Sequence, residues 1–190
     1  MLKAFEDVPR EDFLPDQLKE HAYDDRAMPL LQGQTISQPS TVMIMTQALR
    51  VQEGMTVLDI GSGSGYQAAL LATLAGKSGQ VYATEIVAEL CAYAQERLQG
   101  YDHVRLFHRD GIEEMKEFAP FDRILVAAAC PRIPQPLIDQ LREGGILVAP
   151  VGTVHEQKMI VGKKERKELI THSLGDFVFV PLTGKWGFTR

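Results

Sequence analysis

The chain has 190 residues, enough for one domain with a sizeable core. Its formal net charge is -5, and this mild acidity favours neither duplex nucleic acid nor an anionic membrane surface as a partner. The longest apolar run, around Ile124–Cys130, is too short to span a bilayer, and residues 1–7 lack the apolar stretch of a signal peptide. Cys91 and Cys130 are the two cysteines, a composition that favours a cytoplasmic protein with reduced thiols.

The first 50 residues have a polar, helical pattern that prolines and glycines interrupt repeatedly. The segment Asp24–Ser37 shows neither a helical nor a strand period, so we predict a functional loop there. Pro39 suits the first turn of a helix, and we expect that helix to run to about Arg50.

From Met55 onward, short apolar strands alternate with helices. We expect strands at Thr56–Ile60, Gln80–Thr84, Val104–Phe107, Phe121–Ala127 and Gly145–Val151, and helices at Tyr66–Leu74, Val87–Leu98 and Gln135–Leu141. This alternation implies right-handed crossovers. The predicted class is therefore α/β and Rossmann-like, with a mostly parallel twisted sheet and helices on both faces.

The C-terminal part of the chain has a different pattern. Lys158–Gly162, Glu168–His172 and Phe177–Pro181 predict consecutive strands joined by short turns, which would form an antiparallel edge of the sheet. The charged run Lys163–Lys167 lies at one such turn and is typical of a solvated hairpin tip; a nucleic-acid contact is the less favoured interpretation.

The sequence shows no linker that would divide it, so we predict a single domain over residues 1–190. Residues 1–50 would form a helical and substrate-loop region, residues 51–152 the cofactor-binding core, and residues 153–190 the C-terminal antiparallel strands.

A glycine-rich turn, Gly61-Ser62-Gly63-Ser64-Gly65, follows the first predicted strand and precedes a helix. Glycines permit unusual dihedral angles and a close approach of the backbone, and the N–H groups at a helix N-terminus point at a ligand. Asp59, just before the turn, can fix this loop by accepting backbone hydrogen bonds. Nicotinamide and flavin enzymes use similar loops, so this motif by itself leaves the cofactor open.

Two acidic residues follow the next two predicted strands. Glu85 ends one strand, where a carboxylate can hold both hydroxyls of a ribose, and Asp110-Gly111 follows the other, where a carboxylate can accept a hydrogen bond from an adenine amino group. Taken singly, Glu85 could be a solvated acid at a helix start and Asp110 part of a simple turn. Together with the glycine loop, they predict a nucleoside pocket at the switch point of the sheet.

The sequence resembles the protein-L-isoaspartate O-methyltransferases, a family of class I S-adenosylmethionine-dependent enzymes, from Val8-Pro9-Arg10 to Pro181-Leu182-Thr183. The most specific stretch is Gly33-Gln34-Thr35-Ile36-Ser37-Gln38-Pro39. Further matching segments are Ala22–Asp25, Met45-Thr46, Val57–Tyr66, Asp110-Gly111, Ala119–Asp122, Ile133-Pro134, Leu141–Gly145 and Pro150–Gly152.

The resemblance implies a protein-repair enzyme that moves a methyl group from S-adenosylmethionine to the free α-carboxylate of L-isoaspartyl residues in damaged proteins and peptides. The products would be S-adenosylhomocysteine and an ester that closes to a succinimide, leading to aspartate. No metal is implied, and we expect a monomer. The resemblance makes Ser37 the active-site serine and implies that the cofactor is bound by Gln34, Thr35, Ile36, Ser37, Gly61, Ser62, Gly63, Ser64, Gly65, Glu85, Ile86, Asp110, Gly111 and Thr183.

This chemistry suits the residues that are present. An ordinary carboxylate has a pKa near ~4, so it is ionised at neutral pH and needs no general base. The segment Gly33–Pro39 accordingly contains no histidine or glutamate. Ser37 would orient the carboxylate by donating a hydrogen bond; the simpler interpretation is a helix-capping hydroxyl ahead of Pro39. The small side chains of Ala127–Ala129 would leave room for a peptide backbone, or would simply pack under a helix.

The sequence also departs from the family pattern. Ser40 stands where the family usually has histidine or tyrosine, Glu114 stands where glycine is expected, and the N-terminal helical region is shorter by a few turns. The first departure lies beside the substrate loop and therefore bears on peptide preference more than on the chemistry.

Three other functions remain open at this stage. The nearest is a related methyltransferase that acts on a biosynthetic peptide, a tRNA or a precorrin. The others are a nicotinamide-dependent oxidoreductase and a non-catalytic module that only binds the cofactor. The five histidines, His21, His103, His108, His155 and His172, lack the spacing of metal ligands.

Overall fold

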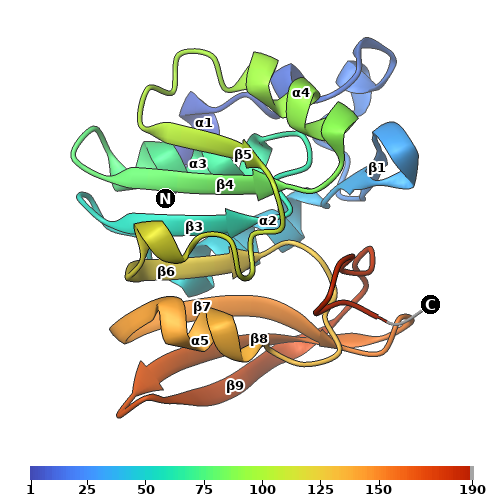
Figure 1. The fold of residues 1–190 in the computed structure, drawn as a ribbon. Helices are drawn as coiled ribbons and strands as arrows, with labels where there is room; N and C mark the ends of the chain where they lie inside the picture. Colours follow the sequence, from blue (N-terminus) through green and yellow to red (C-terminus); the bar gives the residue numbers. More distant parts are fainter. Residues whose placement is uncertain (189–190) are drawn as a thin grey trace.

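The computed structural model describes residues 1–188 and is built on one seven-stranded sheet (Figure 1). The strands lie in the order β5-β4-β3-β6-β7-β8-β9. Five strands of this sheet pair in parallel. They are β3 (Thr56–Ile60), β4 (Gln80–Glu85), β5 (Val104–His108), β6 (Phe121–Val126) and β7 (Leu141–Gly152). The last two, β8 (Gln157–Glu165) and β9 (Glu168–Phe177), add in antiparallel fashion. The predicted α/β class, with a mostly parallel sheet and an antiparallel C-terminal edge, is confirmed.

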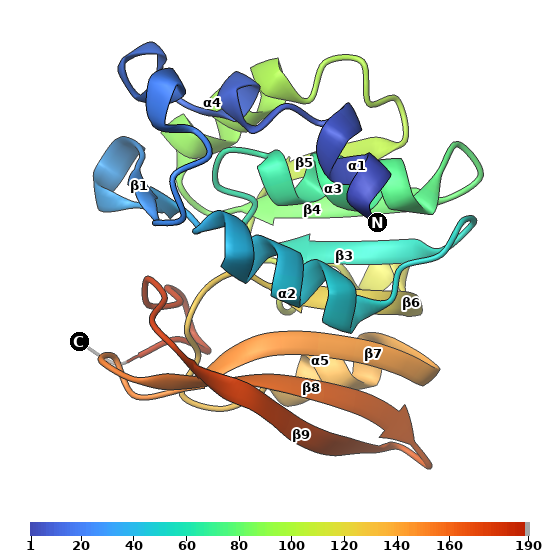
Figure 2. The ribbon, with the colours of Figure 1, turned by 180° about the vertical axis from the view of Figure 1, so that it is seen from behind.

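Helices cover both faces of this sheet because side chains of its buried strands alternate between two apolar cores. In β3, for example, Val57 belongs to one core and Leu58 to the other. The first core lies under the helices α2 (Pro39–Leu49), α3 (Tyr66–Ala75) and α4 (Ala88–Arg97), of which α2 and α3 face the viewer in Figure 2. The opposite core lies under α5 (Gln135–Gln140) and the loop before β6.

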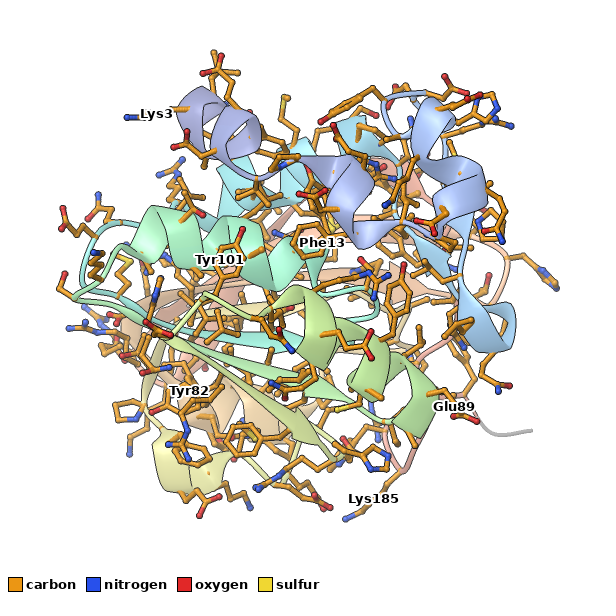
Figure 3. The ribbon with its side chains drawn as sticks, turned by 90° about the horizontal axis from the view of Figure 1, so that it is seen from above. Lys3, Phe13, Tyr82, Glu89, Tyr101 and Lys185 are labelled. Atoms are coloured by element: carbon orange, nitrogen blue, oxygen red, sulfur yellow. The ribbon has the colours of Figure 1, made fainter. Side chains whose placement is uncertain are left out.

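The N-terminal segment packs over the helical layer. It comprises α1 (Leu2–Asp7) and the 3₁₀ helices η1 (Arg10–Phe13) and η2 (Asp16–His21), each 3₁₀ helix preceded by a proline. Phe13, labelled in Figure 3, packs against Tyr66 at the start of α3, with ring centroids 5.5 Å apart. This contact holds the N-terminal segment against the start of α3.

The segment Asp24–Ser37, for which we predicted a loop, contains a small hairpin outside the main sheet. Strands β1 (Met28–Pro29) and β2 (Thr35–Ile36) pair in antiparallel register across the short helix η3 (Leu31–Gly33). Strands of two residues are too short to produce a sequence period, which explains why the pattern shows none.

The predicted strand Phe177–Pro181 is wrong. Strand β9 ends at Phe177, and the chain then turns back toward the carboxyl end of β6. There the Ala129 N–H donates to the Val180 carbonyl at 2.8 Å, and the Leu182 N–H donates to the Ala129 carbonyl at 2.7 Å. Pro181 has no N–H to extend such pairing. The turn brings the C-terminal segment over the ends of the parallel strands.

Within residues 1–188, no helix combines the length and apolarity needed to cross a membrane. The charged run Lys163–Lys167 lies at the turn between β8 and β9, as predicted, with Arg166 and Lys167 in left-handed backbone conformation.

Candidate functional site

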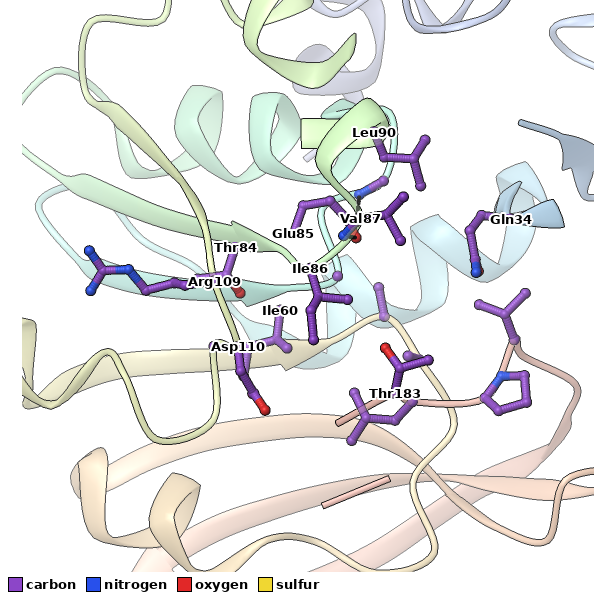
Figure 4. Close-up of a pocket in the computed structure, with 18 of the residues that line it drawn as sticks. Gln34, Ile60, Thr84, Glu85, Ile86, Val87, Leu90, Arg109, Asp110 and Thr183 are labelled. Atoms are coloured by element: carbon purple, nitrogen blue, oxygen red, sulfur yellow. Dashed lines mark hydrogen bonds between the residues drawn. The ribbon is translucent and has the colours of Figure 1, made fainter. Parts of the chain in front are cut away.

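An open cleft of about 640 Å³ lies at the carboxyl ends of β3, β4 and β5 (Figure 4). This volume includes space that is open to solvent. It is lined by residues from these strand ends and from the segments around residues 35, 127 and 182: Gln34, Thr35, Ile60, Gly61, Gly63, Thr84, Glu85, Ile86, Val87, Leu90, Arg109, Asp110, Gly111, Ala127, Ala128, Val180, Pro181, Leu182 and Thr183.

The glycine-rich turn forms one wall of the cleft. Gly61 and Gly63 have φ angles of 82° and 55°, values that favour glycine. The N–H groups of Gly61 and Ser62 both donate to the Thr84 carbonyl at 2.9 Å, so the end of β4 holds the turn.

Asp59 does not fix this turn, and that prediction is wrong. Its side chain is 0% exposed, and its carboxylate accepts no backbone hydrogen bond because the nearby N–H groups donate to Thr84. Burial raises the pKa of Asp59 to about 7; the Ser62 hydroxyl opposes this shift, and the neighbouring Glu85 carboxylate adds a smaller upward contribution. Asp59 is therefore a buried acid beneath the turn, with a charged form that is costly at neutral pH.

Glu85 takes over the role of holding the turn. One of its carboxylate oxygens, Oε2, accepts the Gly63 N–H at 2.9 Å, and the other, Oε1, accepts the Val87 N–H at 2.9 Å. The side chain is 6% exposed and lines the cleft. Each carboxylate oxygen can accept more than one hydrogen bond. Glu85 can thus order the wall and still accept hydrogen bonds from vicinal hydroxyls.

Asp110 and Gly111 form the opposite side. Asp110 Oδ1 accepts the Ile112 N–H at 3.0 Å, and its Oδ2 lies beneath Gly184, where an added Cβ atom would approach it to 2.7 Å. At Gly111, an added Cβ would lie 2.2 Å from Thr84 Oγ1, so only glycine fits against the floor. Thr183 lines the cleft beside these residues (Figure 4).

Two smaller hollows adjoin the cleft. The second is lined by residues of the glycine turn, α2 and the start of α3, and the third by Ala27, Gln38, Thr41 and residues 178–180. Thr35 and Ala127 line all three hollows, and Ser37 lines the second and third. The three spaces therefore border on Thr35 and Ala127, and Ser37 borders on the two smaller ones.

The structure divides the residues predicted to bind cofactor into groups. The cleft contains Gln34, Thr35, Gly61, Gly63, Glu85, Ile86, Asp110, Gly111 and Thr183. The second hollow contains Ile36, Ser37, Ser62 and Ser64. Gly65 lines none of the three hollows described; it precedes α3 with φ 89° and faces Leu98.

Sequence reasoning missed several lining residues. Ile60 and Thr84 were assigned only to strands, although their place at strand ends could have marked them. Val180 and Leu182 could not have been found this way, because their position depends on the pairing with Ala129.

The capping interpretation of Ser37 is wrong. The N-cap residue of helix α2 is Gln38, and its side chain makes no capping hydrogen bond. The Ser40 N–H in its first turn instead donates to Asp25 Oδ1 at 2.9 Å. Ser37 is half-buried at the mouth of two hollows. Ser40 and Glu114 are two residues that depart from the family pattern. Ser40 takes part in this contact, and the backbone carbonyl of the exposed Glu114 accepts a hydrogen bond from the Arg109 side chain.

Comparison with known proteins identifies the family. Residues 1–187 match the sequence family described as protein-L-isoaspartate(D-aspartate) O-methyltransferase (PCMT). The chain belongs to this family. Proteins named protein-L-isoaspartate O-methyltransferase are similar to it along their length: that of Methanocella arvoryzae is 51% identical, over 95% of this chain and 97% of the relative. The one from Methanococcoides burtonii is 47% identical, over 99% of this chain and 94% of the relative.

Solved structures are similar as well. A structure titled protein-L-isoaspartate O-methyltransferase superposes with a TM-score of 0.89 at 29% identity, over 97% of this chain. The present chain spans 61% of that protein. A putative member of the family from Plasmodium falciparum, solved in complex with S-adenosyl-L-homocysteine, gives a TM-score of 0.82 at 25% identity, over 94% of this chain and 87% of the other.

Proposed function

We propose that this chain methylates the α-carboxylate of L-isoaspartyl residues in peptides and damaged proteins, with S-adenosylmethionine as the methyl donor. Family membership over residues 1–187 supports the reaction, and the relatives carry the corresponding name. The observation that carries the proposal is that the cleft and the hollow beside Ser37 share Thr35 and Ala127 as lining residues. A donor and an acceptor can approach each other there from separate spaces.

The residues of the cleft suit S-adenosylmethionine. Glu85 would accept the two ribose hydroxyls, and Asp110, whose Oδ2 carries none of the hydrogen bonds that order its loop, would accept the adenine amino group. The open backbone at Gly61 and Gly63 would let the methionine portion lie close to the turn. Gly111, which lacks a Cβ, lets the segment after β5 pack closely against Thr84 at the floor of the cleft. Thr183 would close the cleft from the C-terminal segment, as it lies across from Glu85.

When bound, S-adenosylmethionine supplies a methyl group attached to a positively charged sulfur. An ionised carboxylate can accept this methyl group without a general base. Ser37 would donate a hydrogen bond to one carboxylate oxygen and leave the other free to face the methyl donor. Ala127, with its small side chain, would leave space for the peptide backbone. The protein's contribution is alignment and exclusion of water, which favours a reaction that neutralises opposite charges. The ester then closes to a succinimide, which hydrolyses in part to aspartate.

The experiment is methyl transfer from labelled S-adenosylmethionine to two peptides that differ only in an isoaspartyl or an aspartyl residue. We expect labelling of the isoaspartyl peptide alone. Equal labelling of both peptides, or of neither with labelling of tRNA, would contradict the proposal. Calorimetry should show binding of S-adenosylhomocysteine and none of NAD, and bound product should raise the melting temperature.

We further propose that the chain works as one domain, as a monomer in the cytoplasm, without a nucleic-acid partner. The continuous seven-stranded sheet and the net charge of -5 support this proposal. Light scattering coupled to gel filtration should give the mass of one chain, and a dimer mass would contradict it.

A further inference from the structure

A carboxylate from outside helix α2 orders the start of that helix. Asp25 Oδ1 accepts the Ser40 N–H at 2.9 Å, and Asp25 Oδ2 accepts Gln38 Nε2 at 3.1 Å. The same Gln38 nitrogen donates to Ser40 Oγ at 2.8 Å. The first turn of a helix has N–H groups without intrahelical partners. Asp25 therefore satisfies one of them and also fixes the side chain that follows Ser37.

The chain is restrained on the other side of Ser37 as well. Ile36 pairs with Met28 across the β1–β2 hairpin and is 4% exposed, and the Leu30 N–H donates to the Gln34 carbonyl at 2.7 Å. Both restraints connect residues 25–30 with residues 34–40. Ser37 lies between them, and none of the side-chain hydrogen bonds of the Asp25 cluster uses its hydroxyl. That hydroxyl is left to serve a ligand in the adjoining hollow.

We propose that Asp25 is a positioning residue for the methyl transfer, which holds Ser37 beside the two smaller hollows through the Ser40 N–H and Gln38. This inference rests on the proposed function and adds to it a residue outside the lining of the cleft. Asp25 acts on the acceptor side, since its partners belong to the segment beside the third hollow. The Ser40 N–H lowers the pKa of Asp25, so the carboxylate stays ionised at neutral pH and its hydrogen bonds remain charge-assisted.

The first test compares variants at two neighbouring acids. Asp25→Ala should lower kcat with the isoaspartyl peptide about 10- to 100-fold, as expected for a small misplacement of an orienting group. Its affinity for S-adenosylhomocysteine should stay within about threefold, because Glu85 and Asp110 are untouched. Asp25→Asn keeps an acceptor oxygen for the Ser40 N–H and should recover part of the loss. Asp24→Ala is the matched control: Asp24 pairs with Arg26 at 3.1 Å on the surface and should retain kcat when replaced.

The second test asks whether Asp25 acts through Ser37. The variants Asp25→Ala, Ser37→Ala and the double variant form a cycle, measured as kcat at saturating cofactor with melting temperatures alongside. If Asp25 positions Ser37, the double variant should be about as slow as Ser37→Ala alone. Losses that multiply would overturn the proposal, because general destabilisation or an independent role would then explain Asp25. If the wild type is active and the Asp25→Ala variant is unimpaired, this proposal is also overturned, and the proposed function stays intact. An inactive wild type would instead contradict the proposed function.

Discussion

The two sides of the candidate site are built in different ways. The cleft rests on the ends of buried parallel strands, where Thr84 is 1% exposed and backbone groups make most of the contacts. The segment beside Ser37 depends on a two-residue hairpin and on exposed side-chain hydrogen bonds from Asp25. Sites on strands hold their geometry more firmly than sites on loops. We therefore expect changes in the loop segment to lower turnover and to leave cofactor affinity nearly unchanged.

Ser37→Ala should separate the two sides most clearly. If Ser37 orients the carboxylate, turnover and kcat/KM should fall together by roughly 10- to 1000-fold, at the low end if a water replaces the hydroxyl. Affinity for S-adenosylhomocysteine should change little. Steady-state kinetics with an isoaspartyl peptide, together with calorimetry, measure both quantities. Near-normal methylation by the variant would remove Ser37 from the mechanism while leaving the family assignment in place.

Asp59→Asn tests the cost of a buried acid beneath the rigid side. The pKa of Asp59 rises from 3.8 to about 7 on burial, so between these values the folded protein holds a proton that the unfolded chain has lost. Wild-type stability should therefore decrease as the pH rises through this window and stay lower above it. The advantage of the asparagine variant in free energy of unfolding should grow between pH 5 and pH 8, by roughly 3 kcal/mol at most. Denaturant unfolding of both proteins at the two pH values measures it; an advantage that is the same at both would contradict the assignment.

Asp110→Ala and Glu85→Ala should each weaken binding of S-adenosylhomocysteine by about 1–3 kcal/mol, as expected for a lost buried hydrogen bond. Glu85→Ala also frees the N–H groups of Gly63 and Val87. With cofactor at saturation, KM for the isoaspartyl peptide should stay near the wild-type value. Calorimetry that gives unchanged affinity in both variants would mean that the nucleoside binds elsewhere.

Lys185→Ala should have the smallest effect. Lys185 Nζ lies 2.9 Å from Glu113 Oε1 and ties the segment after Thr183 to the loop after β5. Exposed ion pairs contribute little, so affinity for S-adenosylhomocysteine should fall by no more than about fivefold. A loss as large as that of Asp110→Ala would show that closure by the C-terminal segment governs cofactor binding, and the contrast between a rigid cleft and a loop segment would need revision.

Much of the rigid side could be read from the sequence. Apolar runs predicted β3 and β4 within a residue, and the convergence of parallel strand ends brought Glu85 and Asp110 to one cleft. The roles of these residues and of Ser37 stay predictions. The loop side was harder to predict. Residues 177–181 have the pattern of a strand, but the chain leaves the sheet after Phe177, and the strands of the hairpin at residues 28–36 are too short to show a period.

The sequence by itself therefore determined the order of strands and helices from β3 to β7, the family, and the residues that strand ends carry to the cleft. The tertiary structure alone decided which groups satisfy one another. Asp25 caps a helix that starts at Pro39, Thr84 and Glu85 rather than Asp59 hold the glycine turn, and Ala129 pairs with residues 180 and 182. The physical reason is that periodicity records which face of an element is buried, whereas a hydrogen bond between distant residues depends on where the whole chain places a donor and an acceptor.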